Sequence, residues 1–398
     1  MTAALAAGSD LDLRHFAHLG DAELAGVLRR PPTPFGRDAD RATLAAGLGA
    51  TLYSPATRPD LVNDLVRARA QGVVSTVLCL EDSIGDDEVA GALDQVVATL
   101  EAVHDRLAEV PLVFVRVRDA AQIGEIAARL GVRSDALSGF VLPKFAAAGG
   151  RRALAEVAAA SATIGRRLWA MPVIETPEVA HRETRIAALR EVAFVLAEAR
   201  EHVLAVRIGA TDLAGVYGLR RPKELTVYDL RVVADAITDI LNVLGRTDDD
   251  AGWVVTGAVW EYFAGAERIF KPQLRETPFG QRERELRARL ITSELDGLIR
   301  EVVLDRANGI VGKTVIHPSH VPVVHALSVV SAEDHADALA VLGHGDGGGV
   351  LRSEYGNKMN ESRPHRAWAL RTLRRAEIFG VARDGVSFAD LLAAVVRG

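Results

Sequence analysis

Short apolar runs rich in β-branched residues alternate with longer segments of helical periodicity along most of this 398-residue chain. Several of the runs are continuously apolar, which is typical of strands that are covered on both faces. We predict eight strands, at Thr51–Pro55, Val73–Glu81, Leu112–Val117, Gly139–Phe145, Arg167–Glu175, Leu204–Gly209, Trp253–Phe263 and Gly312–Pro318.

The segments between these runs carry apolar residues at helical spacing. We predict helices at Asp60–Gln71, Asp87–Val110, Ala120–Leu130, Arg151–Ala160, Val227–Leu244 and Gln281–Ala307. Eight strand–helix units predict an α/β fold, a TIM (β/α)8 barrel. A doubly wound open sheet is the structural alternative, because a local pattern does not show whether a sheet closes on itself.

The barrel pattern leaves a segment at each end of the chain. We predict a helical extension over residues 1–50 that caps the bottom of the barrel, a catalytic barrel over residues 51–325, and a helical lid or oligomerisation segment over residues 326–398. The glycines of Gly343–Gly349 predict a flexible joint.

Beyond that joint comes a polar stretch, Leu351–Pro364, and then two predicted helices, at His365–Phe379 and Phe388–Val396. Ser387 and Asp390 have the spacing of a capping box at the start of the last helix.

Composition narrows the class of protein. Apolar residues make up 49% and charged residues 25% of the chain, as in an ordinary globular protein, and the net charge is -6 without a basic stripe. We therefore expect no nucleic-acid partner. The single cysteine, Cys79, excludes an internal disulfide, and neither a signal peptide nor a membrane span is expected, so we predict a cytoplasmic protein.

Two acidic motifs follow successive strands and point to a metal site. Met171-Pro-Val-Ile-Glu-Thr-Pro177 places Glu175 at the end of one strand, and Val206-Arg-Ile-Gly-Ala-Thr-Asp-Leu213 places Asp212 just beyond the next. Carboxylates at the C-terminal ends of neighbouring parallel strands suit a hard divalent cation. The alternatives are that Glu175 caps a turn and that Asp212 caps the helix that follows it.

Other predicted strands also end in ionisable residues, and in a barrel these ends share one mouth. The residues are Glu81, Asp82, Arg116, Arg118, Lys144, Glu261 and His317. Arg116 lies inside an apolar run, so it needs either an anionic ligand, such as a substrate carboxylate, or a salt bridge to Glu81 or Asp82. Because Glu81 and Asp82 are adjacent on a predicted strand, we expect only one of them to face the site.

The remaining strand-end residues have two interpretations each. Lys144 either binds an anion or pairs with Glu175, and His317 is either an acid/base group or a structural hydrogen-bonding group. Glu261 either binds substrate or anchors a loop. The chain has no Walker loop, no GxGxxG after a strand, no HExxH, no CxxC pair and no GxSxG elbow.

Taken together, these motifs resemble those of the citrate lyase β-subunit/HpcH–HpaI aldolase superfamily. The matching segments span residues 50–325: Tyr53-Ser-Pro-Ala-Thr-Arg58, Leu80-Glu81-Asp82, Arg116 in Val-Arg-Val, Glu175-Thr-Pro177, Gly209-Ala-Thr-Asp-Leu213 and Gly312-Lys-Thr-Val-Ile-His-Pro-Ser319. The tail motif Tyr355-Gly-Asn-Lys-Met-Asn-Glu361 is similar to that of the C–C bond lyases associated with tellurium-resistance gene clusters. The family often has Asp-Leu-Glu-Asp where this chain has Cys79 in place of the first acid.

The resemblance implies a TIM barrel that makes or breaks C–C bonds beside a 2-oxo acid carbonyl or an acyl-CoA thioester. It implies Mg²⁺, or Mn²⁺, on Glu175 and Asp212, and an oxo acid on Arg116, with Glu81, Asp82 and Lys144 as further catalytic groups. Ser54, Arg58, Glu261 and His317 are the remaining candidates for substrate binding. It also implies a homotrimer or hexamer in which a C-terminal segment covers a neighbouring active site.

Three questions stay open at this point. The general base is Glu81, Asp82 or an acid from the tail, for which Glu361 is a candidate. Phosphoenolpyruvate-type chemistry on the same barrel, which requires a phosphate site near the last two strands, is one alternative function. A non-catalytic or regulatory metal-binding barrel in a stress-response gene cluster is the other, since a fold does not fix a function.

Overall fold

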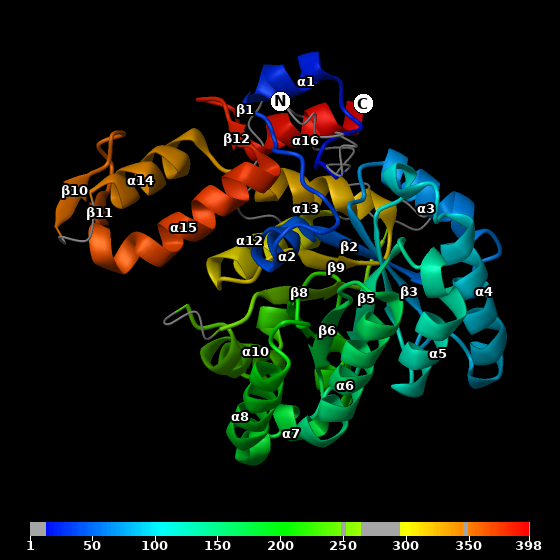
Figure 1. Ribbon diagram of the computed structural model, residues 1–398. Coiled ribbons are helices and arrows are strands. Elements are labelled where there is room, and N and C mark those ends of the chain that lie inside the picture. The colour runs from blue at the N-terminus through cyan, green and yellow to red at the C-terminus, as the bar shows by residue number, and fades with distance from the viewer. Residues whose placement is uncertain (1–12, 248–251, 264–294, 345–348, 398) are drawn as a thin grey trace, which may run out of the picture.

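The computed structural model describes residues 13–247, 252–263, 295–344 and 349–397, and its centre is a closed barrel of eight parallel strands (Figure 1). The first barrel strand pairs with the last, so the sheet closes and the predicted TIM barrel is confirmed. The strands are β2 (Ala50–Pro55), β3 (Ser75–Cys79), β4 (Leu112–Arg116), β5 (Leu137–Leu142), β6 (Trp169–Ile174), β7 (Val206–Ile208), β8 (Val255–Trp260) and β9 (Lys313–Val315).

Helices cover the outside of this barrel. They are α3 (Leu61–Ala70), α4 (Val89–Ala102), α5 (Ala121–Leu130), α6 (Ala147–Ile164), α8 (Arg182–Glu198), α10 (Arg231–Leu244), α12 (Leu295–Ala307) and α13 (Val321–Ser328). In α10 the buried residues recur every three or four positions, from Val233 to Leu244, which is the spacing that turns one helical face towards the strands.

Several predicted helices have different bounds in the structure. The helix predicted at Arg151–Ala160 spans Ala147–Ile164. The helix predicted to reach Val110 ends at Ala102, and a separate 3-10 turn follows at Leu107–Glu109. The helix predicted from Val227 starts at Arg231, after a 3-10 turn that Thr226 and Asp229 cap. The first part of the helix predicted at Gln281–Ala307 lies outside the described residues, which begin again at Leu295.

Strand register decides which side chains enter the barrel. Thr51 pairs with Ser75 across β2 and β3, and the two hydroxyls share a hydrogen bond of 3.0 Å. Cys79 pairs with Arg116, and Val173 pairs with Arg207, along the same alternation. Because side chains alternate between the two faces of a strand, Tyr53, Cys79, Arg116, Glu175 and Arg207 belong to the set that faces inward.

The two ends of the chain pack together beside the barrel. Strand β1 (Leu28–Arg30), which follows α1 (Asp21–Val27), pairs with β12 (Val381–Ala382). Leu13, Phe16 and Leu24 share an apolar cluster with Leu391 and Leu392 of α16 (Phe388–Arg397). Figure 1 shows the blue and red segments side by side at the top of the view.

This packing lies at the N-terminal ends of the barrel strands. The backbone N–H of Ala50, the first residue of β2, donates to Nε2 of the fully buried His325 at 3.2 Å. His15 packs edge-on against His325 with ring centroids 4.4 Å apart, and its Nε2 bonds to the carbonyl of Gly47, the last residue of α2 (Arg41–Gly47). The predicted capping box at Ser387 and Asp390 is confirmed by reciprocal hydrogen bonds.

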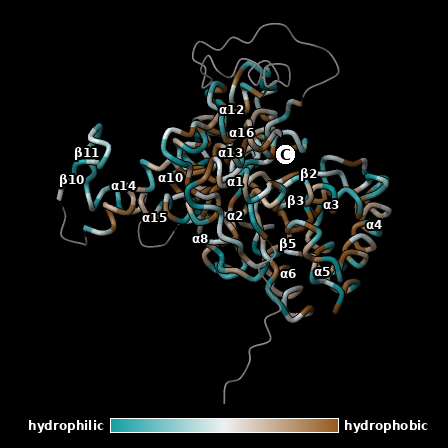
Figure 2. Tube along the Cα trace, turned by 90° about the horizontal axis from the view of Figure 1, so that it is seen from above, coloured by the Kyte–Doolittle hydropathy of each residue, from teal (hydrophilic) through white to brown (hydrophobic). Residues whose placement is uncertain are grey.

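A helical arm extends sideways from the barrel in both views (Figures 1 and 2). It consists of α14 (Ala332–Gly343), α15 (Ser362–Phe379) and a hairpin of β10 (Val350–Arg352) and β11 (Met359–Glu361). The polar stretch Leu351–Pro364 therefore contains two short strands and the start of a helix. Most of the glycine-rich joint, residues 345–348, lies outside the described residues.

Figure 2 shows apolar residues concentrated in the barrel and polar residues on the outer turns. Among the helices of the described residues, none combines the length and the apolar character that crossing a bilayer requires.

Candidate functional site

Charged side chains from three strand ends meet at the mouth of the barrel. Arg116 is the last residue of β4, and its Nη2 lies 2.7 Å from Oε2 of Glu81, 3.4 Å from Oδ2 of Asp82 and 3.5 Å from Oε1 of Glu175. The salt-bridge interpretation of Arg116 is therefore present in the structure. Burial opposes the charge, but the carboxylates of Glu175 and Glu81 outweigh it, so the pKa of Arg116 is raised.

Lys144 joins the same cluster from the end of β5. Its φ of 47° is one of only two positive values for non-glycine residues in the described chain, a conformation that costs free energy and is common at functional sites. In this conformation its backbone N–H donates to Oε1 of Glu175 at 2.8 Å, while Nζ lies 2.6 Å from Oε1 of Glu81 and 3.2 Å from Oδ1 of Asp82. The hydrogen bond to Glu81 raises the pKa of Lys144, which stays an ammonium group.

The expectation that only one of Glu81 and Asp82 faces the site is wrong, because both carboxylates contact Arg116 and Lys144. The physical reason is that β3 ends at Cys79, two residues before the predicted end. Strict alternation of side chains applies only within a strand, and residues 81 and 82 already lie in a turn.

Glu175 is the most buried carboxylate at the mouth, with a side-chain exposure of 2%. Its backbone neighbour across the site is Gly209, where a Cβ atom would lie 1.9 Å from Oε2 of Glu175, so only glycine leaves room for this side chain. Burial, together with repulsion from Asp212, raises the pKa of Glu175 to about 7.

Asp212 is the third residue of the short helix α9 (Ala210–Gly215), whose N-cap is Gly209. The alternative role for Asp212 as a helix cap is therefore absent. Its half-buried carboxylate makes no hydrogen bond or ion pair with any described residue, and Oε2 of Glu175 likewise accepts no hydrogen bond within that part of the chain. Glu175 and Asp212 thus keep oxygen lone pairs that are available to a ligand.

Two candidates from the first barrel strand lie outside this cluster. Ser54 is adjacent to the inward-facing Tyr53, so alternation places it on the opposite face of β2. Arg58 forms an ion pair with Asp64 of α3, with Nε 2.5 Å from Oδ2. The ion pair of Arg58 therefore involves none of the charged residues of the mouth, and Ser54 lies on the other face of its strand.

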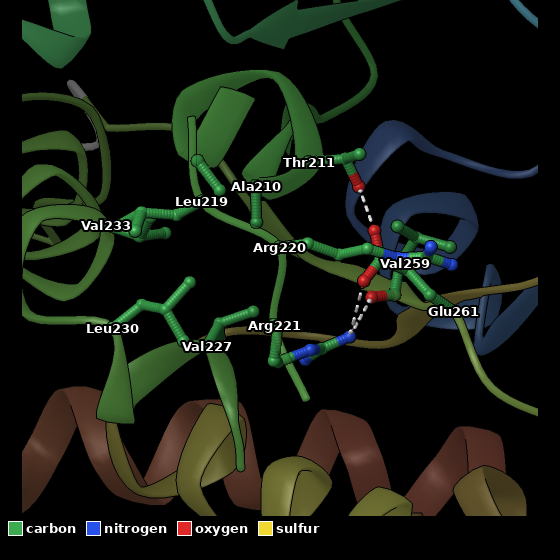
Figure 3. Close-up of a pocket in the computed structure, with 11 residues that line it drawn as sticks. Ala210, Thr211, Leu219, Arg220, Arg221, Val227, Leu230, Val233, Val259 and Glu261 are labelled. Atoms are coloured by element: carbon green, nitrogen blue, oxygen red, sulfur yellow. Dashed lines mark hydrogen bonds and ion pairs between the residues drawn. The ribbon is translucent and has the colours of Figure 1, made fainter. Parts of the chain in front are cut away.

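Two candidates from the last strands are held by local contacts. Nδ1 of His317 lies 2.7 Å from the Ser319 hydroxyl, and its ring stacks on Phe263 with centroids 5.4 Å apart. Glu261 accepts a hydrogen bond of 2.6 Å from the Thr211 hydroxyl and lies 3.6 Å from Nη2 of Arg221, as Figure 3 shows. These contacts match the structural interpretation of His317 and the loop-anchoring interpretation of Glu261.

Glu261 borders a small cavity of about 40 Å³ between α9 and α10 (Figure 3). Apart from Thr211, Glu261 and two arginines its lining is apolar, with Ala210, Leu219 and Val233 among the residues. This volume accommodates a water molecule but not a substrate.

Lys313, the lysine of the Gly312–Ser319 motif, forms ion pairs within the barrel wall. Lys313 is fully buried, and its Nζ lies 2.6 Å from Glu301 and 2.8 Å from Asp305, both on α12. Glu301 also pairs with Arg221 and accepts a hydrogen bond from the Val227 N–H. This buried network ties β9 to α12 and to the segment that precedes α10.

Sequence reasoning did not single out Tyr53 or Arg207, which both face the interior beneath the mouth. Nη2 of Arg207 lies 2.5 Å from the Thr314 hydroxyl, and its guanidinium carbon lies 5.5 Å from the centroid of the Tyr53 ring. Both residues could have been found by stepping back two positions at a time along each strand from the residues at the mouth. That count identifies inward-facing residues only when the sheet is known to close into a barrel.

Comparison with known proteins agrees with this geometry. Residues 42–381 match the model of a protein family described as a C–C bond lyase of the TIM-barrel fold. A citrate lyase from Burkholderia xenovorans LB400 is a similar solved structure, with a TM-score of 0.59 and 17% identity over 87% of this chain and 96% of that one. No curated protein matches the chain.

A second similar structure is the protein CitE from Mycobacterium tuberculosis, in complex with magnesium, acetoacetate and coenzyme A. Its TM-score is 0.51 and its identity 21%, over 83% of this chain and 99% of that one. At these identities the two structures show a common fold.

Proposed function

We propose a reaction for this chain, which belongs to the C–C bond lyase family of the TIM-barrel fold: it cleaves or forms a C–C bond through an enolate. The bond lies beside the carbonyl of a 2-oxo acid or of an acyl-CoA thioester. The observation that carries the proposal is the barrel mouth, where Arg116 contacts three carboxylates and a fourth, Asp212, makes no hydrogen bond or ion pair with any described residue. The CitE structure that holds acetoacetate and coenzyme A supports the choice of substrate class.

The donor set fits a divalent cation on Glu175 and Asp212. Asp212 has no ion-pair partner among the described residues, its charge adds to the burial that raises the pKa of Glu175, and hard oxygen ligands suit Mg²⁺, with Mn²⁺ as an alternative. No group of three or more potential metal-binding side chains occurs in that part of the chain, so water and substrate would complete the coordination. When bound, the cation would act as a Lewis acid on the substrate carbonyl.

The other charged residues position the substrate and handle its proton. Nε of Arg116 is buried without a hydrogen-bond partner, so this guanidinium retains a donor for a substrate oxygen. Lys144 is held as an ammonium group and contributes positive charge rather than acting as a base. Glu81 and Asp82 are the candidates for the general base, and in both the carboxylate is fixed by Lys144.

Calorimetric titration of Mg²⁺ and Mn²⁺ into the full-length protein, with and without oxaloacetate, glyoxylate or acetyl-CoA, tests the metal site. We expect binding that tightens with an oxo acid and that is lost in Glu175→Gln. Glu178→Gln is the matched control, because this exposed carboxylate lies three residues on in helix α7 (Pro177–Ala180). Absence of metal binding in the wild type would leave the non-catalytic barrel as the better interpretation.

Enolate formation has a readout that does not require the second substrate. If the site forms an enolate, the methyl protons of pyruvate or acetyl-CoA exchange with D₂O, and proton NMR follows the loss of signal. We expect exchange in the wild type and none in Glu175→Gln. A protein that binds metal and oxo acid without any exchange would refute enolate chemistry and leave the binding site intact.

The predicted homotrimer or hexamer is part of the proposal. The arm exposes apolar side chains that a monomer has no reason to keep in water: Leu339, Val350, Met359, Trp368 and Leu370. Light scattering on a sizing column measures the assembly, and Leu370→Glu should lower the mass. The likeness to the tellurium-resistance subgroup rests on the tail motif alone, which forms the hairpin of this arm and includes Glu361.

A further inference from the structure

Arg207 is a buried cation without a counter-ion. It is 2% exposed on β7, and among the described residues no carboxylate lies within ion-pair distance of it. Its polar partners are the Thr314 hydroxyl at 2.5 Å and the Met171 sulfur at 3.5 Å, both neutral. Burying an unpaired charge is costly, so its retention at this position needs a reason beyond packing.

Tyr53 lies between this guanidinium and the mouth of the barrel. It shares the inward face of β2 with Thr51, but Thr51 is only 1% exposed whereas Tyr53 is half-buried. The ring lies 5.5 Å from the guanidinium carbon of Arg207, so the cation faces the π electrons of the phenol. The cross-strand partner of Tyr53 is Val77, two residues before Cys79, which itself pairs with Arg116. Tyr53 therefore lies on the inward face just beneath the mouth.

The Tyr53 hydroxyl has a proton to donate. The O–H of Tyr53 has no acceptor among the described residues. Burial raises the pKa of Tyr53, so the hydroxyl keeps its proton at neutral pH and stays a donor.

We infer that Tyr53 is a further catalytic residue, whose hydroxyl donates a hydrogen bond to the substrate oxygen that becomes the enolate oxygen, and that Arg207 is its positioning residue. The inference rests on the proposed enolate reaction. No proton is transferred in this step, and the hydrogen bond shortens and strengthens as negative charge grows on the oxygen. Arg207 withdraws electron density from the phenol oxygen and so makes the O–H a stronger donor.

The test compares two ligands of the full-length protein by calorimetry in the presence of Mg²⁺. Oxalate is a planar dianion that resembles the enolate of pyruvate, whereas pyruvate itself represents the ground state. We expect Tyr53→Phe to weaken oxalate binding by about 10- to 100-fold, the loss of a hydrogen bond to a charged group, and pyruvate binding by less than about 3-fold. Arg207→Met should shift the ratio in the same direction, and Arg207→Lys should restore part of it.

The matched control is Tyr228→Phe, which removes a hydroxyl that donates to Asp305 in the barrel wall, outside the mouth. It should leave the oxalate-to-pyruvate ratio unchanged. Equal weakening of both ligands in Tyr53→Phe, or no weakening of oxalate, would overturn the inference while the proposed function stands. A wild type that binds neither ligand would count against the proposed function itself. If Tyr53→Phe does not fold, the ratio in Arg207→Met decides, and an unchanged ratio there overturns the pairing.

Discussion

Replacing Gly209 by alanine should displace the Glu175 carboxylate without touching its chemistry. The new Cβ would lie 1.9 Å from Oε2, 2.5 Å from Cβ and 2.8 Å from Cδ of Glu175, whereas real Cβ atoms essentially never approach another heavy atom closer than 3.0 Å. Rotation about the side-chain bonds of Glu175 moves its carboxylate but not its Cβ. The contact at 2.5 Å therefore forces the backbone of β6 or of the turn after β7 to shift.

The size of the shift sets the expected effect. Moving Oε2 from 1.9 Å to 3.0 Å requires 1.1 Å, the difference between the two distances. Metal–ligand bonds tolerate roughly 0.2 Å, so a ligand displaced this far is lost to the cation. A misplacement of about 1 Å costs on the order of 100-fold in rate, or about 2.7 kcal/mol in the transition state.

The assay is calorimetric titration of Mn²⁺ together with the exchange of pyruvate methyl protons. Gly215→Ala is the matched control, because Gly215 ends the neighbouring helix α9 and a Cβ there would meet no atom within 4 Å. Circular dichroism and urea unfolding establish that both variants fold. A folded Gly209→Ala protein that binds Mn²⁺ as tightly as the wild type would refute the assignment of Glu175 as a ligand.

Two further predictions concern stability. Burial lowers the pKa of His15 to about 3 and that of His320 to about 4, so between pH 6.5 and these values the unfolded chain takes up protons that the folded chain does not. The free energy of unfolding, measured in urea, should therefore fall as the pH is lowered from 7 to 5. The fall should be up to about 1.4 kcal/mol per pH unit for each histidine. An equally steep fall in His15→Phe would contradict the role of His15. Lys313→Met, which leaves the buried Asp305 without a cation among the described residues while Glu301 keeps Arg221, should cost about 3–5 kcal/mol in the same assay. Arg151→Met also removes a cation from a carboxylate, but from the exposed ion pair with Glu198, and should cost less than about 1 kcal/mol; equal losses would show that burial is not the cause.

The eight barrel strands were predictable because each buried strand is an apolar run in the sequence. What the run does not show is where the strand ends. Val74 and Leu80 extend the apolar pattern beyond β3 on both sides, but the strand pairing stops at Cys79. Burial and hydrogen bonding are different properties, and hydropathy reports only the first. The wrong expectation about Glu81 and Asp82 follows directly from that difference.

The small outer sheets had no local signal at all. Strand β1 pairs with β12, more than 350 residues away, and neither is longer than three residues. The hairpin in the arm has exposed apolar positions and a polar centre, so it lacks the one-sided alternation that marks a half-buried strand. The pairing of β1 with β12 depends on contacts between distant parts of the chain that no window of sequence contains.

The candidate site was also only partly predictable from the sequence. Barrel topology brings the residues at the strand ends together, so the ionisable residues at those ends are predicted to lie at the mouth. It does not predict which residues pair: Lys144 was expected either to bind an anion or to pair with Glu175, and it contacts Glu175 through its backbone N–H while its ammonium group contacts Glu81. The positive φ of Lys144, which makes both contacts possible, is a product of the whole mouth and not of its neighbours in sequence.

The surroundings of Arg207 could not be predicted from the sequence. In the sequence it is one polar residue in an apolar strand, and an arginine in that position is expected to have an acidic partner. Arg116 meets that expectation, with three carboxylates within 3.5 Å, whereas Arg207 has no carboxylate within ion-pair distance among the described residues. Because an unpaired buried charge is costly, the contrast between two arginines on the inward face of one barrel directs attention to Arg207 and to the tyrosine beside it.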